Sequence, residues 1–279
     1  MSTSVRSPVP YFGGKQTIAP WIASLLPSHG HYVEPYCGSL SVLLAKRHSP
    51  METVNDLDGE LMLFWRILRD RPDDLIRACA LTPHGRAEML AAHEPAEDEL
   101  EQARRVWVRL SQSLGGQLRK NGWRHYVNPG AKGNFGMPSY LDGYVDRMAA
   151  VAERLHAVSL ECMPALDLIA KYGRHAEVLL YVDPPYLGTT REATTRYRHE
   201  MKTETEHREL AAALAECKAA VVLSGYHSPL YDELYAGWRR YEHSTITGNG
   251  KGDKGRTEVL WSNARLGDQL DLFAEHTTP

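Results

Sequence analysis

Short apolar strands alternate with helices along most of this chain, and few folds accommodate such an alternation. The segment HYVEPYCG indicates a strand that ends at Gly38, SLSVLLAKR continues as a helix, and METVND is a second strand. Strand, turn, helix and strand in this order open a doubly wound α/β sheet, in which helices pack on both faces of mostly parallel strands. We therefore expect a fold of this class.

The alternation is interrupted once. From about Gly59 to Tyr144 the sequence indicates mostly helices, with apolar residues at helical spacing: Leu100, Ala103, Trp107, Leu110 and Leu114. A basic stretch rich in glycine and asparagine follows these helices. The pattern predicts a discontinuous sheet domain, residues 1–58 and 145–266, with residues 59–144 inserted into it and residues 267–279 as a tail.

The alternation resumes after the insertion. The expected elements are a helix over 144–157, a strand at VSLECM, a helix at PALDLIAKYG, a strand at EVLLYV, a helix over about 205–217 and a strand at AAVVLSGY. The helix over 205–217 has a start signal, because Thr203 and Glu206 are spaced as a capping box. A helix near PLYDELY, a strand near RRYEHS and a closing strand at TEVLWSN follow, which makes six or seven strands in all.

Positive charge is concentrated in one part of the inserted segment. Between Arg104 and Lys132 the chain carries seven arginines and lysines and no acid, although its net charge is -3. Trp107, Trp123 and Tyr126 lie among these charges. A solvated basic face would explain the charges alone, whereas the interleaved rings favour binding of nucleic acid.

Composition argues against several classes of protein. No apolar run approaches the roughly 20 residues that cross a bilayer, and the start MSTSVRSPVP lacks the apolar core of a signal peptide, so we expect the cytoplasm. The four cysteines lie far apart without C-x-x-C spacing, which argues against a zinc knuckle or a disulfide framework. The scattered histidines, including HGH at 29–31, suit caps or the surface better than a metal site.

Two strand ends are candidates for a binding site, because ligands of open α/β sheets bind beyond the carboxyl ends of the strands. One is the DPPY that ends the strand YV, and the other, VEPYCGSLS, lacks the G-x-G-x-x-G pattern of a dinucleotide site. The helix N-terminus at Ser39 to Ser41 suits a carboxylate, and Asp56 at the end of the next strand suits ribose hydroxyls. An adenosine with an amino-acid tail fits this pattern better than NAD.

Four segments carry a family resemblance: PYFGGK near the start, VEPYCGSLSVLLAK, NDLD and, after the helical insertion, DPPY. In this order they resemble the Dam-type (α-group, D12 class) N6-adenine DNA methyltransferases over nearly the whole chain. The later segments VVLSGYHSPLYDELYAGW and RTEVLWSN are similar to phage-borne or solitary members of that family. The resemblance implies a Rossmann-like methyltransferase sheet with a target-recognition domain in the insertion.

The resemblance also implies S-adenosylmethionine as the cofactor. The residues that would close over it are Tyr11, Gly13, Gly14 and Lys15, with Lys15 reaching the cofactor or the strand ends. Those that would surround its methionine part are Glu34, Pro35, Tyr36, Gly38 and Ser39, while Asp56 would hold the ribose and Asp183 would lie beside the cofactor. Local sequence leaves two alternatives, an exposed lysine after a turn at Lys15 and a helix N-cap at Asp56.

In this family the DPPY segment, residues 183–186, forms a seat for the target base. An exocyclic amine is a poor nucleophile, so acceptors that favour its pyramidal form help it to attack the methyl group. Asp183 would accept one amine hydrogen and the Pro184 carbonyl the other, without a strongly shifted pKa and without a metal. Pro185 would stiffen the turn, and Tyr186 would offer a face for stacking. The alternative is a strand that ends in a stiff turn, with Tyr186 as part of the core.

A base inside a duplex must be flipped out to reach this seat, at a cost of a few kcal/mol. Phosphate contacts from the insertion would offset that cost. We expect a hairpin or loop over about 111–135 to enter or border a groove, with Arg119, Lys120, Asn121, Arg124 and Lys132 binding DNA. Gln112 and Gln117, together with Asn121, are candidates for reading base edges, and the loop 247–256 is the next candidate.

Two positions depart from the family pattern. Leu40 occupies the second glycine of the first motif, and Pro164 in ECMPALD stands where an acid commonly follows the third strand. Contacts to the adenine ring of the cofactor would then come from backbone amides or from Met163 and Ala165.

Other functions stay open on sequence alone. Related Asn-Pro-Pro-Tyr and Asp-Pro-Pro-Tyr seats serve methyltransferases of RNA and of protein amides, and a catalytically silent DNA-binding relative would keep the same fold. The basic insertion and the Gly-Gly-Lys segment favour double-stranded DNA, while the intact motif residues favour an active enzyme. The target sequence, a partner in restriction-modification and the oligomeric state stay open, with a monomer favoured.

Overall fold

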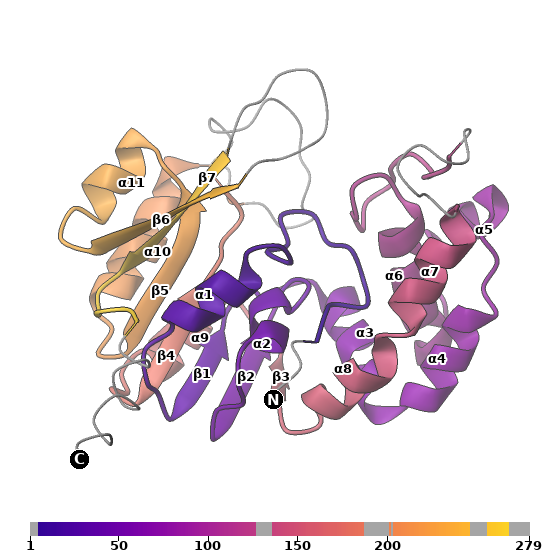
Figure 1. Cartoon of the computed structure of the whole chain (residues 1–279), viewed down its shortest axis with the longest axis horizontal. Coiled ribbons are helices and arrows are strands. Elements are labelled where there is room, and N and C mark those ends of the chain that lie inside the picture. Colours follow the sequence, from indigo (N-terminus) through magenta and orange to yellow (C-terminus); the bar gives the residue numbers. More distant parts are fainter. Residues whose placement is uncertain (1–4, 127–135, 187–200, 202, 246–255, 268–279) are drawn as a thin grey trace, which may run out of the picture.

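The computed structural model describes residues 5–126, 136–186, 201, 203–245 and 256–267. Its centre is a seven-stranded sheet in the order β3-β2-β1-β4-β5-β7-β6 (Figure 1). The strands are β1 His31–Glu34, β2 Met51–Asn55, β3 Ser159–Glu161, β4 Val178–Val182, β5 Ala220–Tyr226, β6 Arg239–Thr245 and β7 Arg256–Ser262. The first five are parallel, whereas β7 runs antiparallel to β5 and β6. The expected α/β sheet is confirmed.

The order of the strands reverses between β1 and β4. From β1 the chain continues to β2 on one side, and the later strands β4 and β5 lie on the other side. Val33 of β1 pairs with Thr53 of β2 and with Leu180 of β4, so the carboxyl ends of these three strands lie at the same edge. A reversal of this kind leaves a crevice at that edge, where ligands of doubly wound sheets bind.

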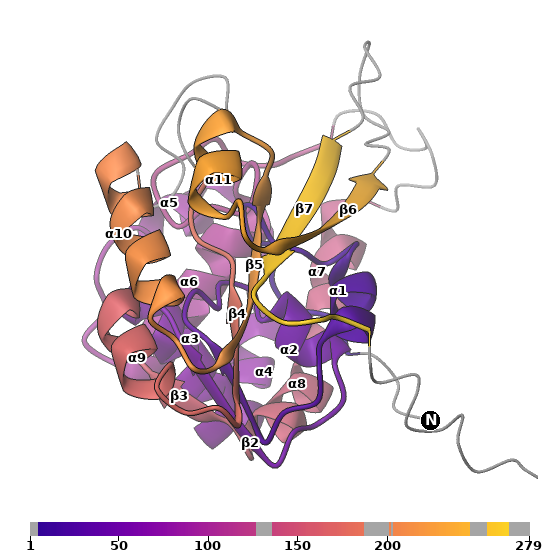
Figure 2. The same cartoon turned by 90° about the vertical axis from the view of Figure 1, so that its left-hand side faces the viewer.

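Side chains along the central strands alternate between two hydrophobic clusters, one on each face of the sheet. In β4, Leu179 and Tyr181 belong to one cluster, and Leu180 and Val182 belong to the other. The first face is covered by α1 Ala19–Leu25 and α2 Ser41–Ala45, and the second by α9 Ala165–Tyr172, α10 Glu204–Ala215 and α11 Pro229–Leu234 (Figure 2). Burial on both faces explains why the sequence of β4 is apolar without interruption.

The insertion forms a group of helices beside the β3 edge of the sheet (Figure 1). They are α3 Gly59–Asp70, α4 Pro72–Ala80, α5 Arg86–Ala91, α6 Glu99–Gln112 and α7 Met137–Val145, followed by α8 Met148–Leu155. The helix expected over 144–157 is present as α8, but its expected start is wrong, because Asp146 and Arg147 separate α8 from α7. Tyr144 continues the apolar spacing of Met137 and Leu141 in α7 and does not begin the next helix.

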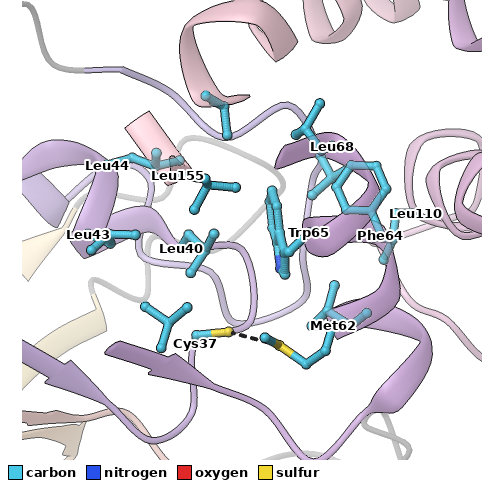
Figure 3. Close-up of a cluster of buried hydrophobic side chains, with 14 of the residues drawn as sticks. Cys37, Leu40, Leu43, Leu44, Met62, Phe64, Trp65, Leu68, Leu110 and Leu155 are labelled. Atoms are coloured by element: carbon cyan, nitrogen blue, oxygen red, sulfur yellow. Dashed lines mark hydrogen bonds between the residues drawn. The ribbon is translucent and has the colours of Figure 1, made fainter. Parts of the chain in front are cut away.

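The helices of the insertion share one hydrophobic core with the sheet. Figure 3 shows Trp65 of α3 among Leu40, which precedes α2, and Leu155 of α8. Trp65 is fully buried, and its indole N–H donates to the carbonyl oxygen of Gly38 at 3.1 Å. The first helix of the insertion therefore supports the turn that follows β1.

The start of α10 confirms a signal in the sequence. Thr203 accepts a hydrogen bond from the Glu206 backbone, and the Glu206 side chain accepts one from the Thr203 backbone, which completes the expected capping box. The helix ends at Ala215, two residues before the expected end.

Neither a membrane span nor a metal site is found in the described part of the chain. No described helix is both long and apolar enough to cross a membrane. The described histidines, cysteines and acids form no group of three or more that could hold a metal ion.

Candidate active site

A cavity of about 430 Å³ lies at the carboxyl ends of β1, β2 and β4. The N-terminal loop, the turns after these strands and after β3, and the start of α10 border it. All eleven residues predicted to bind a cofactor line it: Tyr11, Gly13, Gly14, Lys15, Glu34, Pro35, Tyr36, Gly38, Ser39, Asp56 and Asp183. Segments far apart in the sequence thus meet at one place.

The N-terminal loop lies directly on the turn that follows β1. Gly38 has φ +44°, and a Cβ atom there would lie 3.0 Å from the ring of Tyr11. A Cβ atom at Gly14 would lie 2.9 Å from the Ser39 hydroxyl oxygen. Both contacts are too close for any other residue without a shift. The two glycines therefore let the loop and the turn pack together as one wall of the cavity.

Leu40, at the position of the missing glycine, keeps a left-handed backbone. It has φ 58° and ψ 24° and is the one non-glycine residue with a positive φ among those described. This conformation costs a leucine about 1–2 kcal/mol. The side chain is fully buried in the core of Figure 3, which offsets that cost.

Asn55 ties three strand ends together. Its side-chain amide donates to the carbonyl oxygens of Pro35 at 2.9 Å and Met163 at 3.0 Å. Its side-chain oxygen accepts the Met163 N–H at 2.9 Å. Because Asn55 is fully buried, these bonds hold the turns after β1 and β3 on either side of β2.

Asp56 joins two of the turns that border the cavity. One carboxylate oxygen accepts the Gly38 N–H, and the other accepts the Asp58 N–H, both at 3.0 Å. The N-cap of α3 is Asp58, which accepts hydrogen bonds from the backbone of Glu60 and Leu61. The N-cap alternative for Asp56 is therefore wrong.

The turn after β3 borders the cavity with Pro164, Ala165 and Asp167. Met163 is not among the lining residues, because its side chain packs into the hydrophobic cluster on the second face of the sheet. Asp167 brings an acid to the cavity three residues after Pro164. Sequence reasoning missed this acid, although ECMPALD contains it.

Lys15 lies at the centre of a cluster of polar side chains. Its ammonium is 2.9 Å from a carboxylate oxygen of Asp183 and 3.5 Å from one of Glu258. It also donates to the Gly13 carbonyl at 3.1 Å and to the Tyr186 hydroxyl. The side chain of Lys15 is 7% exposed, so the alternative of an exposed lysine is wrong.

Tyr186 is held by residues of β5 and β7. Its hydroxyl donates to Glu258 at 2.5 Å, and Glu258 also accepts the Ser224 hydroxyl at 2.7 Å. The ring is buried and meets the Tyr226 ring edge-on, with 4.6 Å between centroids. Its role as a stacking face for a base stays a prediction. Sequence reasoning missed Glu258, although an acid in the apolar strand TEVLW is a signal.

Two carboxyl groups at the cavity have raised pKa values. Burial raises the pKa of Asp183 to about 6, an effect that Lys15 opposes and the charge of Glu258 reinforces. Burial raises the pKa of Glu34 to about 8, although it accepts the Tyr32 hydroxyl at 2.9 Å. At neutral pH Asp183 is therefore mostly ionised and Glu34 mostly protonated. Such perturbed groups in one cavity are typical of a functional site.

The part of the basic stretch that follows α6 begins with a hairpin over residues 113–123. Ser113 and Trp123 form an antiparallel bridge, and the N–H of Leu114 donates to the Gly122 carbonyl at 2.8 Å. Lys120 and Asn121, two of the residues expected to bind DNA, lie in the loop between the bridged residues. Both are exposed.

Arg119 and Arg124 are half-buried on the same hairpin. Arg119 donates to the side-chain oxygen of Gln117 at 2.9 Å. The Arg124 guanidinium lies over the Tyr140 ring, 4.3 Å from its centroid, and donates to the Tyr126 hydroxyl at 2.7 Å. These contacts hold both arginines in defined orientations.

The two glutamines do not face solvent. Gln112 is fully buried, donates to the Pro83 carbonyl at 3.0 Å and accepts the Gly85 N–H at 3.3 Å. Gln117 is 6% exposed and accepts the hydrogen bond from Arg119. Their expected role in reading base edges is wrong, because both side chains are buried: Gln112 holds the segment between α4 and α5, and Gln117 holds Arg119 of the hairpin. Lys132 and residues 247–255 lie outside the described residues.

The hairpin contacts the N-terminal loop. The Phe12 N–H donates to the Gly116 carbonyl at 2.9 Å. Gly116 has φ +62°, and a Cβ atom there would lie 2.9 Å from the carbonyl carbon and oxygen of Pro10. The loop that borders the cavity and the hairpin therefore rest on each other through backbone atoms.

Comparisons with known proteins agree with this arrangement. The family model described as D12 class N6 adenine-specific DNA methyltransferase matches residues 11–248. Type II methyltransferase M1.LlaDCHI of Lactococcus lactis subsp. cremoris is 26% identical over 271 residues, covering 90% of this chain and 93% of that protein.

Two solved structures are similar at low identity. Precorrin 8w decarboxylase of Methanobacterium thermoautotrophicum has 9% identity and a TM-score of 0.39, over 93% of this chain and 96% of that one. The rRNA methyltransferase aviRa of Streptomyces viridochromogenes has 16% identity and a TM-score of 0.36, over 92% of this chain and 86% of that one. The family match includes the cavity, Asp183 to Tyr186 and the hairpin, and this chain belongs to the D12 class N6 adenine-specific DNA methyltransferases.

Proposed function

We propose that this DNA adenine methyltransferase uses S-adenosylmethionine as its methyl donor and holds it in the cavity at the carboxyl ends of β1, β2 and β4. The chemistry of the lining supports this. The carboxyl groups that line the cavity are those of Glu34, Asp56, Asp58, Asp167, Asp183, Glu206 and Glu209, and Lys15 is the one basic side chain among the described lining residues. An acidic cavity suits a ligand that carries a sulfonium and an ammonium group.

The lining residues divide according to the parts of this cofactor. The turn from Glu34 to Ser39 would hold the methionine part, and the loop from Tyr11 to Lys15 would cover it. Asp56 would accept the ribose hydroxyls, since it lines the cavity at the carboxyl end of β2 and the Gly38 and Asp58 N–H groups hold its carboxylate in place. Ala165 and the backbone beside it would contact the adenine ring.

The residues from Asp183 to Tyr186 would receive the flipped adenine. When bound, S-adenosylmethionine supplies a methyl group activated by its sulfonium. Asp183 accepts one hydrogen of the N6 amine and the Pro184 carbonyl the other, which favours the pyramidal nitrogen that attacks. Pro185 stiffens this turn, and the Tyr186 ring lies against the base. Because its pKa is about 6, Asp183 is ionised at neutral pH and accepts the proton that the methylated amine releases.

The hairpin would read the target sequence in the duplex. Lys120 and Asn121 are exposed, and Arg119 and Arg124 are oriented by neighbours. Lys132, outside the described residues, is a further candidate for a DNA contact. In this arrangement residues 1–58 and 145–266 form the catalytic domain, residues 59–144 the target-recognition domain and residues 267–279 a tail. The observation that carries the proposal is the single cavity in which six further carboxyl groups, Asp56 and Asp183 among them, lie beside the protonated Glu34.

The test compares the wild-type enzyme with Asp183→Ala. Both are incubated with duplex DNA and labelled S-adenosylmethionine, and the nucleosides are analysed for N6-methyladenine. We expect the product with wild type and none with Asp183→Ala, while calorimetry shows that both bind the cofactor. Asp74→Ala, at an exposed acid of α4, is the matched control and keeps full activity. Full activity of Asp183→Ala would refute its assignment, and no cofactor binding by wild type would refute the choice of donor.

A further inference from the structure

Glu258 is a buried carboxylate that directly precedes the apolar run of β7. It is 6% exposed, and Val259, Leu260 and Trp261, which follow it in β7, are fully buried or nearly so. Burying a carboxylate is costly unless hydrogen bonds compensate it, and Glu258 accepts two, from Tyr186 at 2.5 Å and Ser224 at 2.7 Å. Its carboxylate thus lies in the cluster that contains the proposed catalytic residue Asp183.

The hydroxyl of Tyr186 lies within reach of two carboxylates. It donates to Glu258, and a hydrogen bond with Tyr186 also acts on the pKa of Asp183. Lys15 donates to the oxygen of the same hydroxyl. Since a hydroxyl has one proton, Glu258 and Asp183 compete for it, and the hydrogen bond to Glu258 directs it away from Asp183. Burial raises the pKa of Tyr186 well above its ordinary value, so the hydroxyl keeps this proton in the working range of pH.

We propose that Glu258 is a positioning residue for methyl transfer: by accepting the Tyr186 hydroxyl proton it fixes the ring that faces the base and keeps the oxygens of Asp183 available for the target amine. This inference rests on the proposed function, because it needs Asp183 to accept the amine. Ser224 in turn holds Glu258, so β5 and β7 both contribute to the geometry of the DPPY turn.

The charge of Glu258 has a second effect, on the protonation of Asp183. Ionisable groups from several elements act on Asp183: Lys15 of the N-terminal loop, Glu34 of β1, Tyr181 of β4, Tyr186 after β4, Tyr231 of α11 and Glu258 of β7. Among them Glu258 raises the pKa of Asp183 and Lys15 lowers it. Removing the charge of Glu258 therefore lowers the pKa of Asp183.

The test uses the full-length enzyme with Glu258→Gln, which keeps the shape of the side chain and removes its charge. The glutamine oxygen can still accept the Tyr186 hydroxyl, but the hydrogen bond is then neutral and weaker. We therefore expect kcat to fall about five- to tenfold. The acidic limb of the pH profile should move to lower pH, a change that a merely structural role would not produce. Glu242→Gln, at an exposed acid of the neighbouring strand β6, is the matched control and should change neither.

A double-mutant cycle with Tyr186→Phe tests the route through the hydroxyl. If Glu258 acts through Tyr186, Glu258→Gln should reduce kcat little further once that hydroxyl is absent. Glu258→Asp keeps the charge but shortens the side chain, so it should lower kcat and leave the acidic limb in place. It serves as the test if Glu258→Gln does not fold, as judged by circular dichroism.

Three results would overturn the inference: kcat of Glu258→Gln within twofold of wild type, additive losses in the cycle, or an acidic limb that does not move. If Glu258→Asp is the variant tested, undiminished kcat overturns it. Failure of the proposed function looks different, because wild type itself would then not transfer methyl groups from S-adenosylmethionine, or Asp183→Ala would stay active.

Discussion

The ammonium of Lys15 lies 2.9 Å from the carboxylate of Asp183, and both side chains are largely withdrawn from solvent. A positive charge at this distance favours the ionised carboxylate. It opposes the effect of burial, which alone would raise the pKa of Asp183 beyond about 6. The Gly-Gly-Lys loop near the N-terminus therefore helps to keep Asp183 in the ionised state that the proposed role of the DPPY turn requires.

Replacing Lys15 by Met should move the acidic limb of activity to higher pH. In wild type we expect activity to be present above about pH 6 and to fall as Asp183 is protonated below it. Without the lysine the pKa of Asp183 rises, so activity near neutral pH falls more than activity in alkaline buffer. Initial rates across the pH range test this, with Lys171→Met at an exposed lysine as the control. An acidic limb that stays in place would contradict the prediction.

Glu34→Gln should make the stability of the fold less dependent on pH. The pKa of Glu34 is raised from 4.5 to about 8, so its contribution to stability is fully present below pH 4.5 and lost as pH rises through 8. The free energy of unfolding, measured with urea, should be higher at pH 5 than at pH 8 for wild type. This difference should be up to a few kcal/mol larger than the one for Glu34→Gln. Glu153→Gln, at an exposed acid of α8, should behave as wild type. Equal pH dependence in all three proteins would show that Glu34 does not titrate in this way.

At position 40, glycine should not be less stabilising than alanine, although it is at most positions. At φ 58° a glycine carries no strain, whereas alanine retains most of it. Both substitutions empty a fully buried site and should cost about 2–5 kcal/mol, as other large-to-small core changes do. Thermal and urea unfolding should find Leu40→Gly at least as stable as Leu40→Ala. A markedly less stable glycine variant would mean that backbone strain is not significant there.

Gly116→Ala should weaken cofactor binding although the residue does not line the cavity. Its Cβ would press on the backbone of Pro10 at 2.9 Å and displace the loop that includes Tyr11. Calorimetry with S-adenosylmethionine should show the loss, and Gly237→Ala, where a Cβ meets nothing within 4 Å, should show none. Equal affinities for the two variants would indicate that the loop adjusts freely.

The hairpin residues should separate into two classes in DNA binding. Lys120→Ala should lower affinity for all sequences alike and reduce the salt slope by about one, as loss of a phosphate contact does. Arg124→Ala should instead relax the preference between matched and mismatched duplexes, because neighbouring rings orient its guanidinium. Titrations at several salt concentrations measure both effects. The control is Arg174→Ala, at an exposed arginine between α9 and β4. If neither variant differs from Arg174→Ala, recognition lies outside this hairpin.

Much of the sheet could be predicted because its central strands β1, β4 and β5 are short, mostly apolar and bounded by turn signals. The order of the strands and the antiparallel direction of β7 could not, since pairing depends on contacts between distant segments. The break between α7 and α8 was missed for a local reason: the apolar spacing of Tyr144 is compatible with either helix.

The cavity could be predicted because the motif residues follow strands whose carboxyl ends lie at one edge. The buried polar residues could not. The basic stretch around Gln112 indicated a surface residue. Its side chain instead donates to the carbonyl of residue 83 and accepts the N–H of residue 85 inside the insertion. Glu258 was missed because its partner Tyr186 is 72 positions away in the chain. Whether a polar side chain is buried depends on such distant partners.

The hydrogen bond from Trp65 to the Gly38 carbonyl limits how this enzyme can be re-engineered. Exchanging the inserted segment between relatives at residue 59 would replace α3, and with it the Trp65 indole that donates to the turn after β1. Such a chimera would alter the wall of the cavity that this turn forms, in addition to any change in DNA recognition. A graft that joins the chains beyond Asp70 and keeps α3 and α8 of the recipient leaves that wall intact.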